Sequence, residues 1–180
     1  MYFAKVLPYI MFLTFAGCGN ITDDLQPSSE DKRAVIETGV AGFGEGQIAP
    51  EFTVYDTLGN STTLDSALTG SKGIVLYFTM WCPLCDSHQD NMQNYVVPDF
   101  SADVKFYLVD YITASVENSR ASQISNGYTT FNVLADIGQD ILTAYKATMG
   151  TTVVIDSAGI IRMNEEYKKA TLIETLGALQ

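Results

Sequence analysis

The sequence predicts an α/β fold, a sandwich of helices around a mixed central sheet. Short apolar runs rich in β-branched and aromatic residues alternate with more polar stretches of helical length. Strands that alternate with helices and then end in a hairpin and a last helix are typical of this architecture. Residues 47–180 provide enough chain for one domain with a real core.

The first half of this domain begins with a β-hairpin whose turn is expected at Gly59-Asn60. A buried strand, a helix that Pro98 should stop or kink, and a second buried strand follow. The predicted elements are the hairpin at 52–56 and 61–64, the strand at 73–79, the helix at 83–97 and the strand at 104–110.

The second half begins with a polar helix for which Ser115 is a suitable N-cap. A short strand, a helix, a hairpin that turns at 157–159 and a last helix complete the domain. These elements are predicted at 116–128, 131–135, 139–145, 151–156 with 160–164, and 170–179.

The most informative motif is Trp-Cys-Pro-Leu-Cys at 81–85, between the predicted strand at 73–79 and a helix. The first turn of a helix carries free N–H groups and the positive end of the dipole. A thiolate of Cys82 would be stabilised there, with a pKa below the free value of about 8.5. Cys85 follows one turn later, and Pro83 suits the first helical position. The pattern predicts a redox site.

The alternatives to a redox pair are two inert cysteines in the core and a structural metal site. A structural zinc site needs four ligands. The chain has three Cys and one His, and Cys18 is far from the pair in the sequence. This count favours redox chemistry.

Residues 1–17 predict an export signal, with Lys5 near the start and a mostly apolar stretch at 6–16. That stretch is shorter than the roughly 20 residues of a membrane span. The Ala-Gly-Cys ending at Cys18 resembles a bacterial lipobox, although Phe15 stands at its usual Leu position. The resemblance implies cleavage before Cys18 and a lipid on its thiol. An ordinary signal peptide or an uncleaved anchor is the alternative.

Acylation of Cys18 would leave a single cysteine pair. The residue after Cys18 is Gly19, whereas an Asp at this position would resemble an inner-membrane retention signal. For a Gram-negative cell, this favours a lipid anchor in the outer membrane, on the periplasmic side. Residues 18–46 are predicted to be the lipidated Cys and a flexible tether. The formal charge of −11 disfavours nucleic-acid binding, which needs a basic face.

The chain resembles the thioredoxin superfamily, in its extracytoplasmic TlpA/ResA branch, which overlaps the redoxin and AhpC/TSA group. Four segments carry this resemblance: 48–52, Gly59 with 63–64, 76–85, and 151–156 with Gly159. It implies a thioredoxin-like three-layer α/β/α sandwich with a mixed central sheet and an N-terminal β-hairpin. It also implies a thiol–disulfide oxidoreductase whose partners are thiol- or disulfide-bearing proteins.

The resemblance also implies roles for single residues. Cys82 would attack as the exposed thiolate, and Cys85 would resolve the mixed disulfide. Trp81 would pack beside the disulfide, with Pro83 supporting the start of the helix. Members often carry an acidic residue six positions before the first Cys, where this chain has Leu76.

A second departure is His88, which replaces a Glu that relays protons in TlpA-like members. His88 is the only histidine and follows Cys85 by three residues, on the same helix face. Its ordinary pKa near 6.5 suits proton transfer to or from Cys85. A surface histidine without a role is the alternative.

The third departure lies in the predicted substrate groove, formed by Met149, Gly150 and Thr151. Gly150 replaces the family's cis-proline. The Met149-Gly150 bond is expected to be trans, because a cis bond before a residue other than proline costs about 3–4 kcal/mol.

Two alternative functions remain. Cys82, Cys85, Met149 and His88 are ligand types suited to Cu(I), so a Sco-like copper chaperone is one, although Sco proteins space these ligands differently. No cofactor or metal is expected otherwise. A thiol peroxidase is less favoured: Thr79 matches the peroxiredoxin pattern, but Val75 stands in place of its proline.

Overall fold

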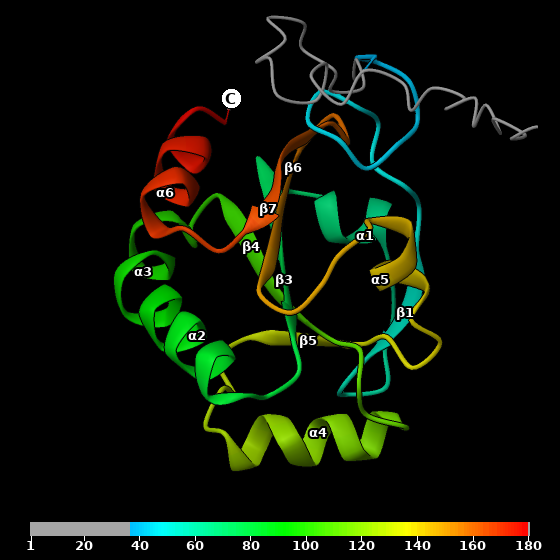
Figure 1. The fold of residues 1–180 in the computed structure, drawn as a ribbon, viewed down its shortest axis with the longest axis vertical. Helices are drawn as coiled ribbons and strands as arrows, with labels where there is room; N and C mark the ends of the chain where they lie inside the picture. Colours follow the sequence, from blue (N-terminus) through cyan, green and yellow to red (C-terminus); the bar gives the residue numbers. More distant parts are fainter. Residues whose placement is uncertain (1–36, 180) are drawn as a thin grey trace, which may run out of the picture. The chain divides into compact units, whose positions relative to one another are not determined.

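The computed structural model describes residues 37–179, and the export signal, Cys18 and residues 19–36 lie outside that range. The described part contains one mixed sheet of seven strands in the order β2-β1-β5-β4-β3-β6-β7 (Figure 1). The strands are β1 (Thr53–Asp56), β2 (Ser61–Thr63), β3 (Gly73–Thr79), β4 (Val104–Asp110), β5 (Asn132–Ala135), β6 (Thr151–Asp156) and β7 (Ile161–Glu166). The helices are α1 (Leu64–Leu68), α2 (Pro83–Tyr95), α3 (Val97–Phe100), α4 (Val116–Ser125), α5 (Asp140–Ala144) and α6 (Lys169–Gly177).

The three central strands β3, β4 and β5 run parallel, and every other pairing in the sheet is antiparallel. Thr79 at the end of β3 pairs with Asp110 at the end of β4. Because β6 runs against β3, it begins at this same edge of the sheet. The loops after β3 and β4 and the loop before β6 therefore meet at one end of the domain.

Helices cover both faces of the sheet, as the sequence predicted. In β3, Ile74, Leu76 and Phe78 pack into one apolar cluster, which also holds residues of α1 and α5. Val75 and Tyr77 pack into the other cluster, under α2 and α6. This alternation follows from the two-residue period of a strand. Figure 1 shows α2, α3 and α6 on one side of the sheet, α1 and α5 on the other, and α4 beside β5.

The predicted hairpin and all the predicted helices are present, with some shifted ends. The helix predicted at 83–97 ends at Tyr95, and Pro98 lies in the first turn of the separate helix α3, where its missing N–H is tolerated. The helix predicted to reach 128 ends at Ser125. The helix α1 was not predicted; a capping box between Thr63 and Ser66 starts it.

The folded part begins before residue 47, the boundary expected from the sequence. The N–H of Gly39 donates to Gly46 O at 2.9 Å, and the N–H of Gly46 donates to Ile161 O at 2.8 Å. Ile48 forms an isolated bridge with Ile160. Residues 39–48, most of them assigned to the tether, are thus attached to the β6–β7 hairpin. Among residues 37–179, no helix is long and apolar enough to cross a membrane.

Candidate active site

Cys82 and Cys85 lie where the chain leaves β3 and enters α2. Cys82 is the N-cap of α2, and its Sγ accepts a hydrogen bond from the Cys85 N–H at 3.1 Å. Pro83 occupies the first turn, as predicted. Cys85 is buried and Cys82 is partly exposed, both are free thiols, and their Sγ atoms lie 2.6 Å apart. The pair therefore combines one accessible sulfur with one hidden sulfur in direct contact.

The surroundings of Cys82 favour its thiolate. Burial opposes ionisation, but hydrogen bonds from the Cys85 thiol and from the backbone N–H groups of Cys85 and Leu84 outweigh it. The pKa of the Cys82 thiol therefore lies below its ordinary value. Because the thiolate is the nucleophile, this position makes Cys82 the more suitable attacking sulfur.

Trp81 connects β3 to the dithiol and is partly buried against the cluster that contains Cys85. Its backbone has a positive φ of 56°, and its N–H donates to Thr79 Oγ1 at 3.1 Å. The same hydroxyl oxygen accepts a hydrogen bond from Gln89 Nε2 at 3.0 Å. Thr79 therefore holds the turn between β3 and α2 in place.

The three residues of the predicted groove lie in the loop before β6 or at its start, but only one of them reaches the thiols. The Sδ of Met149 lies 3.3 Å from the Sγ of Cys82, which donates to it. Thr151 is buried, and its hydroxyl accepts from the N–H of Thr148 at 2.9 Å. Met149 thus contacts the attacking sulfur, whereas Thr151 stabilises the loop.

Gly150 adopts a left-handed backbone with φ of +80°, which disfavours any residue with a side chain. As expected, the peptide bond before it is trans, and no bond among residues 37–179 is cis. The N–H of Gly150 donates to Phe78 O, and the carbonyl of Gly150 accepts from the N–H of Tyr167, both at 2.9 Å. A Cβ at Gly150 would lie 3.7 Å from His88 Nδ1 and 4.0 Å from the Tyr77 hydroxyl. The backbone here therefore covers those two side chains.

His88 is half-buried and makes no hydrogen bond to Cys85 in the described part of the chain. Its Nδ1 lies 3.0 Å from the hydroxyl of Tyr77, and its ring packs on Tyr167 with centroids 4.8 Å apart. Burial lowers the pKa of His88, and the carboxylate of Glu166 offsets part of that effect. His88 is thus directed at Tyr77 rather than at the sulfur atoms.

The orientation of His88 bears on the copper alternative. The structure brings together the sulfur atoms of Cys82, Cys85 and Met149, but His88 Nδ1 is engaged with Tyr77. No group of three or more His, Cys, Asp or Glu side chains suited to a metal occurs among residues 37–179. The expected set of four ligands is therefore not assembled.

Several residues around the thiols were not predicted from the sequence. Tyr111 follows β4, and burial and then the negative charges of the two thiols raise the pKa of its hydroxyl. The exposed apolar side chains of Met80 and Ile112 lie just before the motif and just after β4. The sequence could have pointed to these residues through the two buried strands at 73–79 and 104–110. If the strands pair in parallel, the residues that follow each of them lie at the same edge of the sheet.

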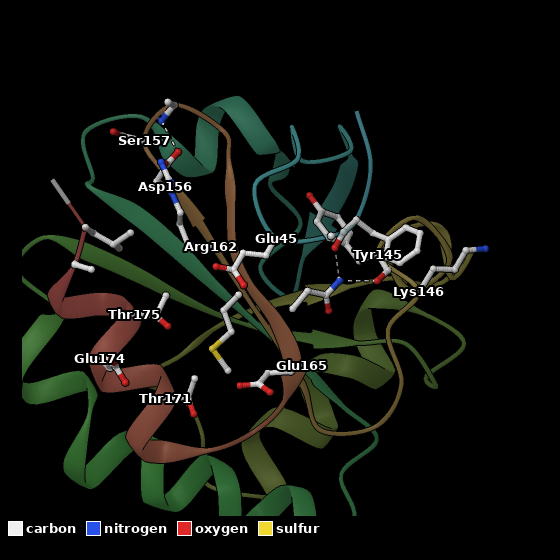
Figure 2. Close-up of a pocket in the computed structure, with 17 residues that line it drawn as sticks. Glu45, Tyr145, Lys146, Asp156, Ser157, Arg162, Glu165, Thr171, Glu174 and Thr175 are labelled. Atoms are coloured by element: carbon white, nitrogen blue, oxygen red, sulfur yellow. Dashed lines mark hydrogen bonds and ion pairs between the residues drawn. The ribbon is translucent and has the colours of Figure 1, made fainter. Parts of the chain in front are cut away.

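One pocket in the described part of the chain is well separated from the thiols, which are not among its lining residues. It has a volume of about 1180 Å³ and lies between α6, the β6–β7 hairpin and the loop at Glu45 (Figure 2). Arg162 on its wall is paired with Asp156, with Nε 2.7 Å from Oδ2. Of the two thiols, Cys82 is instead partly exposed, at the edge of the sheet where β3 ends.

Comparisons with known proteins agree with this geometry. The model of the AhpC/TSA family matches residues 46–164. A candidate protein disulfide isomerase from Bacteroides thetaiotaomicron is similar, with 27% identity and a TM-score of 0.64 over 76% of this chain and 89% of that chain. A comparison with curated proteins finds no match.

Two further solved structures show a thioredoxin-like fold. One is the thioredoxin domain of a thiol-disulfide oxidoreductase from Bacteroides vulgatus, with 19% identity, a TM-score of 0.60, and coverage of 77% of this chain and 97% of that chain. The other is a secreted disulfide oxidoreductase from Mycobacterium tuberculosis, with 22% identity, a TM-score of 0.55, and coverage of 71% and 96%.

Proposed function

The chain belongs to the AhpC/TSA family, and we propose that it is a lipid-anchored, extracytoplasmic thiol–disulfide oxidoreductase that exchanges disulfides with proteins. The observation that carries the proposal is the contact between a partly exposed Cys82 at a helix N-terminus and a buried Cys85. The similarity to solved thioredoxin-like proteins, among them a thiol-disulfide oxidoreductase, supports it.

The reaction needs only the two sulfur atoms and a partner disulfide. The Cys82 thiolate attacks one partner sulfur; the partner's S–S bond breaks, a mixed disulfide forms, and the released partner thiolate takes up a proton. Cys85 then loses its proton and attacks the Cys82 sulfur. The Cys82–Cys85 disulfide forms and the second partner thiol leaves, so two electrons pass from the dithiol to the partner. The reverse sequence oxidises a partner dithiol.

Reduction of insulin in the presence of dithiothreitol tests this function. The wild-type protein should accelerate precipitation of the insulin B chain well above the rate with dithiothreitol alone. The Cys82→Ser variant should give only that background rate, because it has lost the attacking sulfur. A wild-type rate no higher than that of Cys82→Ser would refute the proposal.

The lipid anchor and the compartment rest on the sequence at 1–18. Cleavage before Cys18 and acylation of its thiol would hold the domain at the outer membrane, facing the periplasm, with thiol- or disulfide-bearing proteins as partners. Palmitate labelling of the full chain in a Gram-negative host should mark the wild-type protein and not Cys18→Ser. An unlabelled wild-type protein would refute lipidation and leave the exchange reaction untouched.

The peroxidase alternative is weaker, and the reason lies in the polar groups near Cys82. The hydroxyl of Thr79 already accepts hydrogen bonds from Trp81 and Gln89. The two described arginines are engaged elsewhere: Arg120 with Gln123, and Arg162 with Asp156. Consumption of hydrogen peroxide should therefore be slow compared with insulin reduction.

A further inference from the structure

The turn between β3 and α2 contains a strained backbone position immediately before the reactive cysteine. Trp81 has a φ of 56°, in the left-handed region that is costly for any residue with a Cβ and rare for a bulky one. The next residue, Cys82, has an extended backbone, with φ of −86° and ψ of 162°, and is the N-cap of α2. The backbone of Trp81 therefore determines where the Cys82 sulfur lies. Strain at such a position points to a functional constraint.

A second unusual feature is a buried amide two turns into α2. Gln89 is fully buried, and its Oε1 has no hydrogen-bond partner among residues 37–179. Its Nε2 donates to Thr79 Oγ1 at 3.0 Å. A buried amide with an unpaired oxygen costs stability, and a leucine of similar length would avoid that cost. The bond to Thr79 is therefore the interaction that the amide provides here and that a leucine would not.

The strained residue and the buried amide meet at one atom, the hydroxyl oxygen of Thr79. Thr79 is fully buried at the end of β3. Its Oγ1 accepts a hydrogen bond from the Trp81 N–H at 3.1 Å as well as the one from Gln89 Nε2. A hydroxyl oxygen has two lone pairs, so both acceptor positions are occupied. Gln89 thus fixes the direction of the Thr79 hydroxyl, and that hydroxyl holds the Trp81 N–H.

We propose that Thr79 and Gln89 are positioning residues for the Cys82 thiolate, an inference that rests on the thiol–disulfide exchange proposed above. Their hydrogen bonds hold Trp81 in the left-handed conformation. This conformation keeps Cys82 at the N-cap, where its Sγ accepts from the Cys85 N–H at 3.1 Å. Without these bonds, Trp81 relaxes to a negative φ, and the Cys82 sulfur moves away from the free N–H groups of the first turn.

Loss of those N–H groups affects the two protonation states of Cys82 differently. The thiolate loses stabilising hydrogen bonds and the thiol does not, so the pKa of Cys82 rises. The other titratable groups that respond to its charge are Cys85 on α2, Tyr77 on β3 and Tyr111 after β4. The pKa values of both tyrosines are raised, so they stay neutral while Cys82 titrates. The pH profile of Cys82 therefore reports its position at the helix.

Alkylation of the reduced protein by iodoacetamide, measured as a function of pH, tests this role. Thr79→Val keeps a β-branched side chain without the hydroxyl. It should move the midpoint of the profile upward by about 0.5–1 pH unit, the shift for loss of one hydrogen bond to the sulfur. Thr79→Ser keeps the hydroxyl and should retain the wild-type midpoint. Gln89→Leu should shift the midpoint in the same direction as Thr79→Val but by less, because the Thr79 hydroxyl remains.

A double variant shows whether Gln89 acts through Thr79. Thr79→Val combined with Gln89→Leu should have the midpoint of Thr79→Val alone, because the amide has no hydroxyl left to orient. Gln93→Leu is the matched control, since it makes the same change one turn further along α2. The Gln93 amide accepts from Thr130 Oγ1 at 3.0 Å, so its loss should leave the midpoint unchanged.

The outcomes separate the positioning role from the exchange function. An unchanged midpoint in a folded Thr79→Val overturns the positioning role, and so do shifts that add in the double variant. Gln89→Leu carries the test if Thr79→Val does not fold, and an unchanged midpoint there overturns the role as well. If the midpoints shift as stated but the wild-type protein does not reduce insulin, the positioning of Cys82 stands and the exchange function is refuted.

Discussion

The Sδ of Met149 lies 3.3 Å from the Sγ of Cys82, although 67 residues separate them in the sequence. A thioether accepts hydrogen bonds but cannot donate one, so it favours the protonated thiol over the thiolate. Met149 therefore opposes the backbone N–H groups of α2, which stabilise the thiolate. The reactivity of Cys82 is set by the balance between these two contacts.

Met149→Leu removes the acceptor and keeps a similar volume. The thiolate should gain about 0.5 kcal/mol relative to the thiol, the low end for a hydrogen bond. We expect alkylation of Cys82 by iodoacetamide at pH 7 to become about twofold faster. Met80→Leu is the control, because Met80 is exposed near the motif and should leave the rate unchanged. A slower rate in Met149→Leu would contradict this account.

The lowered pKa of Cys82 predicts a shifted pH profile. The rate of alkylation by iodoacetamide should reach half its maximum below the value of about 8.5 for a free thiol. Cys85→Ser should move this midpoint upward, because the Cys85 thiol donates one of the stabilising hydrogen bonds. A midpoint at or above that of glutathione would contradict the geometry at the N-terminus of α2.

The same shift links the stability of the reduced protein to pH. The pKa of Cys82 is lower in the folded chain than in the unfolded chain, so folding favours the thiolate. This contribution is fully present above the unfolded value of about 8.5 and is lost as pH falls through the folded pKa. Urea midpoints of the reduced protein should therefore fall more steeply with decreasing pH than those of Cys82→Ser. Parallel curves would exclude the linkage.

Gly150 provides a test of the loop that carries Met149. Gly150→Ala should lose about 1–2 kcal/mol of unfolding free energy, because φ of +80° is costly for a residue with a Cβ. Gly159→Ala is the matched control, since its φ is +77° and nothing lies near its Cβ position. Urea unfolding should give similar losses for both. A much larger loss at Gly150 would mean that the Cβ clashes with His88 or Tyr77.

Trp81 is the only tryptophan in the chain and lies beside the dithiol. Its fluorescence should change when the disulfide is reduced. Titration against mixtures of reduced and oxidised glutathione should then give a two-electron transition with a potential between about −270 and −120 mV, the range of related dithiols. The double variant Cys82→Ser with Cys85→Ser should show no transition. If the fluorescence of both proteins drifts in the same way along the titration, with no transition, then Trp81 fluorescence does not report the oxidation state of the thiols.

Much of the fold could be predicted because the central strands are continuous apolar runs. The strands at 73–79, 104–110 and 151–156 have the bounds expected from the sequence. The short helices α1 and α3 were missed, since their few residues have no detectable period. The attachment of residues 39–48 to the β6–β7 hairpin depends on backbone hydrogen bonds, which leave no pattern in side-chain type.

From the residues alone, without the family resemblance that pointed to 149–151, the site could be predicted only where it is local in the sequence. Cys82, Pro83 and Cys85 could be placed because a strand followed by a helix fixes their surroundings. The partner of His88 could not be predicted, because a fully buried strand has no polar face to show that Tyr77 points toward α2. Met149 reaches Cys82 only through the pairing of β3 with β6, which no local pattern specifies.

Trapping with the Cys85→Ser variant of the full chain tests the central claim most directly. Without Cys85, the mixed disulfide formed by Cys82 cannot be resolved and should accumulate. We expect adducts with cellular proteins that dithiothreitol releases and that mass spectrometry maps to Cys82. Adducts no more abundant than those of the double variant Cys82→Ser with Cys85→Ser would contradict the claim that this dithiol exchanges disulfides with proteins.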